Sequence, residues 1–371
     1  MTLSQPENDL LSSPFPYFSL AFNADGSNIA LSSSQTSVFT HRLPIHKWKG
    51  QGATYVGHNG SITSASFSND KTLLLSASSD ASVRVWRKDH TDVPGLLMSH
   101  YLHPPAGFDP AFSLASPLRL TSAIRNKPFA CPIKQAGFFF QDRLIMITVK
   151  NQLLLYSYEI TEQEKDSLIK RPSSCGQYQQ VHACVHEGCQ NITFAVCANS
   201  IQSPLLFTAT SDRKVVIVDA TEGKIVTSFD CLHEKSVHCI ALPSPSIYTQ
   251  LPSDIYNVFA TAAIDNTVIL WDLRDRTPVA RYSGHLNRRE EVGVSLSPCM
   301  KFLATGSEDR SARILDLRMM RQLAKLSGHR DVCSDVKFNP LFPQLVSCSY
   351  DGTIRFFADP SAAASDLAAF M

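Results

Sequence analysis

Two stretches of the chain are written almost alike: residues 259–274 read FATAAIDNTVILWDLR, and residues 303–318 read LATGSEDRSARILDLR. In both, a short apolar run leads to a polar turn with one Asp, a β-branched run follows, and the stretch ends in Asp-Leu-Arg. Self-similarity at a regular spacing is the signature of a repeat fold, so this repeat decides what the rest of the chain must build.

The same turn recurs with one internal spacing. In five places an Asp stands six positions before a bulky apolar residue: Asp80 before Trp86, Asp212 before Val218, Asp265 before Trp271, Asp309 before Leu315, and Asp351 before Phe357. The runs around these turns are short, rich in β-branched residues and alternate with period two, which is typical of strands. Each unit therefore holds about four short strands.

Two weaker units complete the repeat. Residues 17–39 have a turn near Gln35, and residues 133–158 have Lys150-Asn151 where the Asp is expected. Units this small cannot bury their own faces, so they must stack radially into a closed ring. We predict an all-β protein, a seven-bladed β-propeller of four-stranded antiparallel blades over residues 14–358, with degenerate first and third blades. Residues 1–13 are a short segment, of which 7–12 are expected to close the ring, and 359–371 are expected to be a disordered tail.

Composition restricts the class of protein further. The 371 residues carry a net charge of +1 and are 44% hydrophobic, a balance that argues against a dedicated nucleic-acid binder. The N-terminus lacks a signal-peptide pattern and no apolar run approaches the roughly 18 residues of a membrane span. We therefore expect an intracellular protein, cytoplasmic rather than nuclear, with its ten cysteines reduced. Without a nucleotide-binding or nucleophile motif, it is expected to be a non-enzyme with no cofactor and no small-molecule substrate.

A family resemblance follows from Gly-His and Trp-Asp pairs at the expected places. Gly57-His58, Gly284-His285, Gly328-His329 and Trp271-Asp272 make the chain resemble the WD-repeat β-propeller family. The resemblance implies a protein-interaction scaffold that binds one or more proteins or peptides, with neither nucleic acid nor membrane as a partner. It speaks for the fold far more than for any chemistry.

The resemblance also implies a structural tetrad in each blade, in which a His, a Ser or Thr, the turn Asp and a Trp are hydrogen-bonded. A buried carboxylate or indole N–H needs such partners. The predicted members are His58, Ser78, Asp80, Trp86, Thr210, Asp212, Asp265, Trp271, His285, Ser307, Asp309, His329, Ser349 and Asp351. Only the set from His58 to Trp86 is expected to be complete, because Ala263 stands at the hydroxyl position of the fifth unit. A trio that recurs in every blade is a building element rather than a hydrolytic triad.

The loops that carry the His and Asp residues form one rim of the predicted ring. Binding residues concentrate on loops held by a rigid scaffold, and Arg and Tyr are favoured types. The predicted partner-binding face consists of Asn59, Arg213, Lys235, Asn266, Arg288, Arg289, Glu308, Arg310, Arg330 and Tyr350. An acidic partner is favoured by the arginines.

Two alternatives remain open. In the family, Trp-Asp-x-Arg in consecutive blades marks proteins that dock onto the adaptor of cullin-4 ubiquitin ligases, and the matching residues are Trp271, Asp272, Arg274, Asp316 and Arg318. The second alternative is a zinc or thiol site near Cys184 and Cys189, where HACVHEGC at 182–189 offers four borderline-soft ligands. Ordinary strand residues are the competing interpretation, so no metal site is assigned.

Three long insertions interrupt the repeat, at residues 89–130, 161–174 and 243–257. Long loops in a compact fold are either functional or disordered, and the residue types do not distinguish these outcomes.

Overall fold

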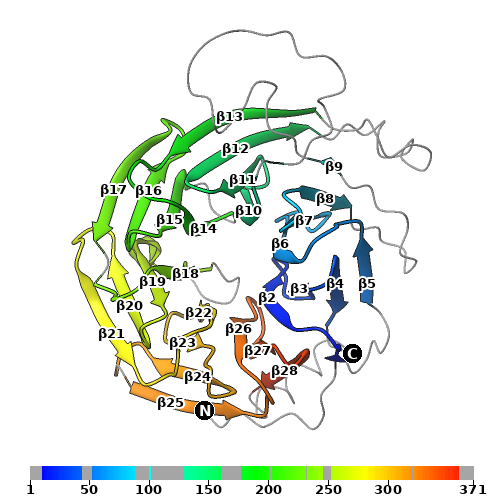
Figure 1. Cartoon of the computed structure of the whole chain (residues 1–371). Helices are drawn as coiled ribbons and strands as arrows, with labels where there is room; N and C mark the ends of the chain where they lie inside the picture. The colour runs from blue at the N-terminus through cyan, green and yellow to red at the C-terminus, as the bar shows by residue number, and fades with distance from the viewer. Residues whose placement is uncertain are drawn as a thin grey trace.

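The computed structural model contains seven sheets arranged around one axis (Figure 1), which confirms the predicted all-β, seven-bladed propeller. It describes residues 11–43, 52–87, 100–101, 129, 131–159, 177–199, 203–230, 232–244, 252–319 and 321–358. Each sheet has four strands, including those of the degenerate first and third blades. The insertion at 161–174, the tail at 359–371 and most of the insertion at 89–130 lie outside the described residues.

The strands follow the chain blade by blade. Blade 1 contains β2 (Tyr17–Phe22), β3 (Asn28–Ser33), β4 (Ser37–Arg42) and β5 (Gly52–Val56), and blade 2 contains β6 (Ile62–Phe67), β7 (Leu73–Ser78), β8 (Val83–Arg87) and β9 (His100–Tyr101). Blade 3 contains β10 (Ile133–Phe139), β11 (Leu144–Val149), β12 (Gln152–Glu159) and β13 (Gln177–Val185). Blade 4 contains β14 (Ile192–Cys197), β15 (Leu205–Thr210), β16 (Lys214–Asp219) and β17 (Lys224–Asp230).

Blades 5 to 7 contain β18 (Val237–Ala241), β19 (Val258–Ala263), β20 (Thr267–Asp272), β21 (Pro278–Ser283); β22 (Val294–Leu296), β23 (Phe302–Thr305), β24 (Ser311–Asp316), β25 (Arg321–Ser327); and β26 (Cys333–Phe338), β27 (Gln344–Ser349), β28 (Thr353–Ala358), β1 (Leu11–Ser12). The short 3-10 helix η2 (Ser253–Asn257) ends the insertion of blade 5. No helix in the described part of the chain has the length and hydropathy needed to span a bilayer.

The ring is closed by the N-terminal segment. β1 pairs antiparallel with β28, with Leu11 opposite Ile354, so the last blade takes its outer strand from residues within the 7–12 segment. Ser13 N–H continues the contact by donating to Gly352 O over 2.8 Å. The pairing covers the edge of β28, which would otherwise expose unpaired backbone groups.

The core lies between neighbouring blades. The second strands β3 and β7 are buried along their whole length, because each is covered by a blade on both faces. One apolar cluster joins Leu75 and Val83 of blade 2 to Phe138 and Ile145 of blade 3, and similar clusters join the other neighbours. This is the shared burial that the small repeat units require.

Candidate interaction face

Every blade presents the same two kinds of connection at one end. In blades 2, 4, 5, 6 and 7 the loop before the inner strand carries a His, and the turn between the second and third strands carries an Asp. The corresponding turns of blades 1 and 3 carry Gln35 and Lys150-Asn151 instead. We call the surface built by these loops and turns the His/Asp face, and the surface built by the other connections the opposite face.

Blade 2 shows how a tetrad is assembled. Trp86 Nε1–H donates to Ser76 Oγ over 2.7 Å, and the Ser76 hydroxyl lies 2.8 Å from His58 Nε2. His58 Nδ1 lies 3.1 Å from Asp80 Oδ2, which also accepts Asn59 N–H over 2.8 Å. Because the Asp80 carboxylate can only accept, His58 Nδ1–H donates to it, and the neutral ring then accepts the Ser76 hydroxyl proton at Nε2.

The bridging hydroxyl is therefore Ser76, and the prediction of Ser78 was wrong. Ser78 Oγ instead accepts Asp80 N–H over 3.1 Å and caps the turn. The physical reason is the orientation of the imidazole. Nδ1 contacts Asp80 at the turn, so Nε2 points away from the turn and contacts Ser76, which lies two residues farther from the turn than Ser78. The same correction applies to Thr210, Ser307 and Ser349, each of which lies at the turn position of its own blade.

Blade 5 contains a second complete tetrad, contrary to expectation. His233 Nδ1 lies 3.0 Å from Asp265 Oδ2, and its Nε2 lies 2.9 Å from Thr261 Oγ1. Trp271 Nε1–H donates to the same Thr261 hydroxyl over 2.9 Å. The sequence does contain the required hydroxyl, because Thr261 stands four residues before Asp265, as Ser76 does before Asp80. The prediction looked two residues before the Asp instead, where Ala263 stands.

Blades 4 and 7 hold partial sets. His329 Nε2 lies 2.7 Å from Ser347 Oγ, and its Nδ1 lies 3.6 Å from Asp351, with Phe357 in place of the Trp. His186 Nε2 lies 3.3 Å from Thr208 Oγ1, whereas its Nδ1 has no partner among the described residues. Again the hydroxyl stands four residues before the Asp.

Blade 6 lacks the predicted pairing of His285 with Asp309. The Asp309 carboxylate is drawn instead to Arg313 at 2.6 Å and Lys325 at 2.9 Å. Ser307 Oγ accepts Leu286 N–H over 3.0 Å, so it takes the N–H that the turn Asp accepts in blades 2, 5 and 7. His285 Nε2 is left buried without a partner among the described residues.

Burial sets the charge of His58 and His285. It lowers the pKa of His58 to about 4 and that of His285 to about 4, so both rings are neutral at pH 7. Burial pushes the pKa of Asp265 upward, but hydrogen bonds from His233 and Thr267 outweigh it and hold that pKa well below its usual range. A neutral imidazole that donates to a buried carboxylate is a stabilising element of the blade.

The loop Leu286–Glu291 distinguishes blade 6 from the others. Glu308 Oε1 accepts three successive backbone N–H groups, from Arg288 and Arg289 at 2.6 Å each and from Glu290 at 3.0 Å. Successive N–H groups that converge on one anion form a nest. Burial raises the pKa of Glu308, but these three N–H groups outweigh it and the pKa is lowered. Glu308 therefore organises this loop.

The other residues of the predicted partner-binding face are either hydrogen-bonded or packed within the rim, or exposed to solvent. Asn266 Oδ1 accepts Asn287 N–H over 2.7 Å, and Tyr350 is half-buried with its ring edge-on to Phe18 at 6.0 Å, so both help to hold the rim together. Asn59 is exposed and uses its backbone N–H in the tetrad. The remaining predicted residues are all exposed cations: Arg213, Lys235, Arg288, Arg289, Arg310 and Arg330.

These cations gather where the acidic side chains are already engaged. Four of them, Arg288, Arg289, Arg310 and Arg330, lie on neighbouring loops and turns of blades 6 and 7, and within the described residues none of them forms an ion pair. By contrast, Glu308 is held by backbone N–H groups and Glu291 by Lys134. The exposed acids Glu234 and Asp331 temper the positive charge of this face without abolishing it.

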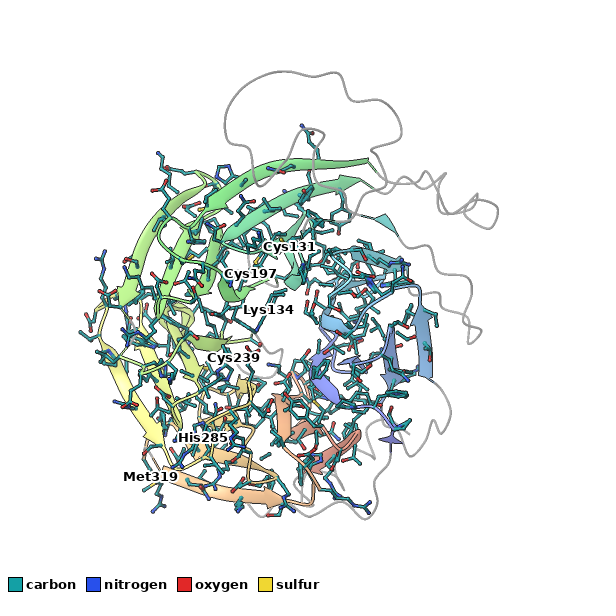
Figure 2. All side chains as sticks on the ribbon, in the orientation of Figure 1. Cys131, Lys134, Cys197, Cys239, His285 and Met319 are labelled. Carbon is teal, nitrogen blue, oxygen red and sulfur yellow. The ribbon has the colours of Figure 1, made fainter. Side chains whose placement is uncertain are left out.

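The opposite face carries the Trp-Asp-x-Arg residues. Trp271 is buried in its tetrad, so its assignment to a docking surface was wrong. Arg274 donates to both oxygens of Asp272, at 3.1 and 2.8 Å, and also lies 3.6 Å from Asp254. In the next blade, Asp316 Oδ1 accepts Arg318 N–H over 2.7 Å, and the exposed Arg318 is followed by exposed Met319 (Figure 2).

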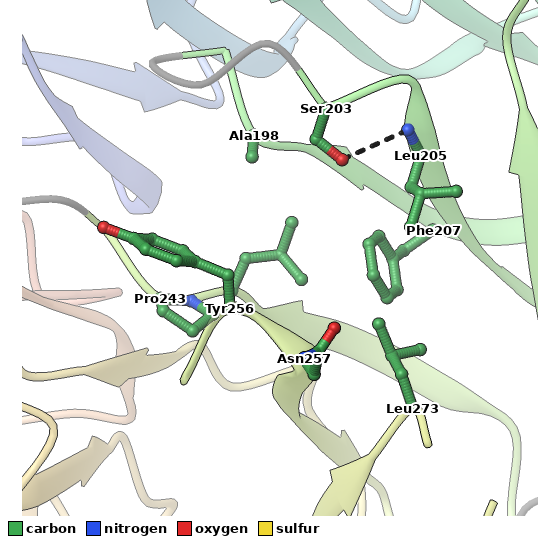
Figure 3. Close-up of a pocket in the computed structure, with 9 residues that line it drawn as sticks. Ala198, Ser203, Leu205, Phe207, Pro243, Tyr256, Asn257 and Leu273 are labelled. Carbon is green, nitrogen blue, oxygen red and sulfur yellow. Dashed lines mark hydrogen bonds between the residues drawn. The ribbon is translucent and has the colours of Figure 1, made fainter. Parts of the chain in front are cut away.

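A mostly apolar pocket opens beside Arg274. It has a volume of about 330 Å³ and lies between blades 4 and 5, with Leu205, Phe207, Leu242, Tyr256 and Leu273 among its lining residues (Figure 3). Leu273 is the variable residue of the Trp-Asp-x-Arg stretch, so this stretch borders an apolar surface as well as charged groups.

The zinc or thiol site considered as an alternative does not assemble among the described residues. His182 Nε2 is 3.1 Å from Gly223 O, Cys189 Sγ donates to His186 O over 3.4 Å, and Cys184 is buried. Burial raises the pKa of both thiols, which disfavours the thiolate that a metal or a nucleophile needs. In the described part of the chain no three potential ligands converge.

Comparison with known proteins agrees with this geometry. The family model "WD domain, G-beta repeat" matches residues 50–87, 276–316 and 320–357. Each match contains the outer strand of one blade and the first three strands of the next, which is why the N-terminus must supply the last outer strand. The chain is a β-propeller by its sheets. By its repeats, it matches the WD-repeat model in three of the seven units.

Relatives share parts of the chain. A LEC14B homolog from Prunus armeniaca is 40% identical over 86 residues, which is 22% of this chain and 18% of the relative. A Denticleless protein homolog from Danio rerio is 21% identical over 81% of this chain and 44% of its own length. A U3 small nucleolar RNA-associated protein 21 homolog from Schizosaccharomyces pombe is 21% identical over 92% of this chain and 39% of its own length. The chain thus spans less than half of each of these relatives.

Proposed function

We propose that the protein is a non-catalytic scaffold that binds an acidic segment of another protein on the His/Asp face of blades 6 and 7. The observation that carries the proposal is the set Arg288, Arg289, Arg310 and Arg330, exposed on neighbouring loops without an ion pair among the described residues. Arginine is favoured at binding hot spots because its planar fork binds carboxylates in a bidentate manner. We further propose that it acts inside the cell, in the cytoplasm rather than the nucleus.

Charge reversal tests this assignment. Arg288→Glu, Arg310→Glu and Arg330→Glu in one variant should abolish salt-dependent binding of a fluorescein-labelled octaglutamate peptide, followed by fluorescence anisotropy. Arg274→Glu, Arg276→Glu and Arg318→Glu in one variant is the matched control, because these three arginines are also exposed but lie on the opposite face. Equal binding by the wild type and the triple variant would refute the proposal.

Docking onto the cullin-4 adaptor is the second candidate function. Arg318 favours it, because this arginine is exposed on the opposite face, whereas Arg274 is held by Asp272. We therefore expect Arg318→Ala to weaken adaptor capture from lysate more than Arg274→Ala does. Failure to recover the adaptor with the wild-type protein would dismiss this candidate.

A further inference from the structure

An ion pair crosses the ring between two opposite blades. Lys134 extends from β10 of blade 3 toward the axis (Figure 2), and its Nζ lies 2.6 Å from Oε1 of Glu291, which precedes β22 of blade 6. The side chains are 45% and 49% exposed, so water reaches both charges. An ion pair that is so accessible contributes little to stability and exchanges easily.

The backbone on either side of Glu291 is fixed independently of this ion pair. Glu290 N–H donates to Glu308 Oε1 over 3.0 Å. On the other side, Val292 N and Val292 O lie 3.1 and 2.9 Å from the buried His238 Nε2. The Glu291 carboxylate can therefore leave Lys134 by rotation of its own side chain, while the loop that carries Arg288 and Arg289 stays in place.

We infer that Lys134 is a further cationic residue of the partner-binding site and that Glu291 is an internal competitor for it. A partner carboxylate that reaches the axis from Arg288 and Arg289 would replace Glu291 on the Lys134 ammonium, since the two acids offer the same chemistry. This inference rests on the proposed function, and it adds a residue from blade 3 to a site otherwise built by blades 6 and 7.

The octaglutamate probe tests the inference by fluorescence anisotropy. Glu291→Gln should tighten binding about fivefold, because it removes the competitor for one exposed ion pair. Lys134→Ala should weaken binding by a similar factor. Asp331→Asn is the control for general charge, because it also removes one exposed negative charge but lies in the loop before β26, and among the described residues Asp331 forms no ion pair with Lys134.

The double variant distinguishes competition from a field effect. In the Lys134→Ala background, Glu291→Gln should give no gain beyond that of Asp331→Asn. If the gain persists without Lys134, or if Asp331→Asn gives an equal gain in the wild type, Lys134 is not part of the site. Probe binding that depends on the arginines but not on Glu291 would leave the proposed function standing and remove this inference. Absence of any binding to the wild type and to Glu291→Gln would remove both.

Discussion

At the scale of single residues, the tetrad depends on which hydroxyl meets the histidine. In blades 2 and 5 the hydroxyl four residues before the Asp joins the indole to the imidazole, and in blades 4 and 7 the hydroxyl at the same position contacts the imidazole where no indole is present. The hydroxyl two residues before the Asp serves the turn in blades 2 and 7. Two hydroxyls on one strand thus have separate roles.

Ser76→Ala and Ser78→Ala test this division. Ser76→Ala should destabilise the protein by about 2 kcal/mol, because it leaves both the Trp86 N–H and His58 Nε2 buried without a partner. Ser78→Ala should cost about 1 kcal/mol or less, because it removes only the acceptor of Asp80 N–H. Urea unfolding followed by tryptophan fluorescence measures both. A larger loss for Ser78→Ala would contradict the tetrad described for blade 2.

At the scale of elements, the outer strands of blades 3 to 6 share an irregularity. Each of β13, β17, β21 and β25 has a bulge, and the extra residue is aliphatic and 42–55% exposed: Val181, Val226, Val279 and Leu323. A bulge interrupts the ladder and twists the edge, which discourages pairing with a foreign strand. This feature leaves the loops as the surfaces available for specific binding.

The closing strand is the element on which the ring depends. Gly352 adopts a φ of +73°, and a Cβ there would lie 2.0 Å from Ser13 O. Gly352→Ala should therefore lower the free energy of unfolding by about 3 kcal/mol, the sum of backbone strain and loss of the β1 contact. Differential scanning calorimetry should show a lower melting temperature.

Gly188→Ala is the control for backbone strain alone. Gly188 also has a positive φ, of +85°, but nothing lies within 4 Å of the added Cβ. Its cost should be about 1 kcal/mol. Equal losses for the two variants would show that the approach of Ser13 does not matter.

At the scale of the whole molecule, the buried histidines link stability to pH. His58 and His285 have folded-state pKa values of about 4, below the ordinary value of 6.5, so the unfolded chain binds more protons between these limits. Their contribution is fully present above pH 6.5 and is lost as pH falls toward 4. The two groups together give a slope on the order of 2 to 3 kcal/mol per pH unit.

Urea unfolding at a series of pH values between 7.5 and 4.5 measures this slope. His285→Leu should reduce it by about 1.4 kcal/mol per pH unit, because it removes one titrating group while His58 and the other buried histidines remain. A free energy of unfolding that stays constant from pH 7 to pH 5 would contradict the neutral, buried state of both rings.

The amino-acid sequence alone determined the number of blades, the strands and the face on which the His and Asp residues lie. These features follow from a local period and from turn chemistry within about ten residues. It also indicated the exposed arginines, because they flank the repeated motifs. The prediction of the bridging hydroxyl was wrong. Ser76 and Ser78 are two positions apart and lie on the same face of β7, and the residue type does not show which of them meets the histidine.

Only the tertiary structure decided which distant residues meet. The register of β1 on β28, the binding of the Arg288–Glu290 backbone by Glu308, and the ion pair between Lys134 and Glu291 join segments that no local pattern connects. The absence of a tetrad at His285 was also decided by the tertiary structure, because Asp309 forms ion pairs with Arg313 and Lys325 instead. Such contacts depend on how the closed ring brings loops together, and that closure is a property of all seven blades at once.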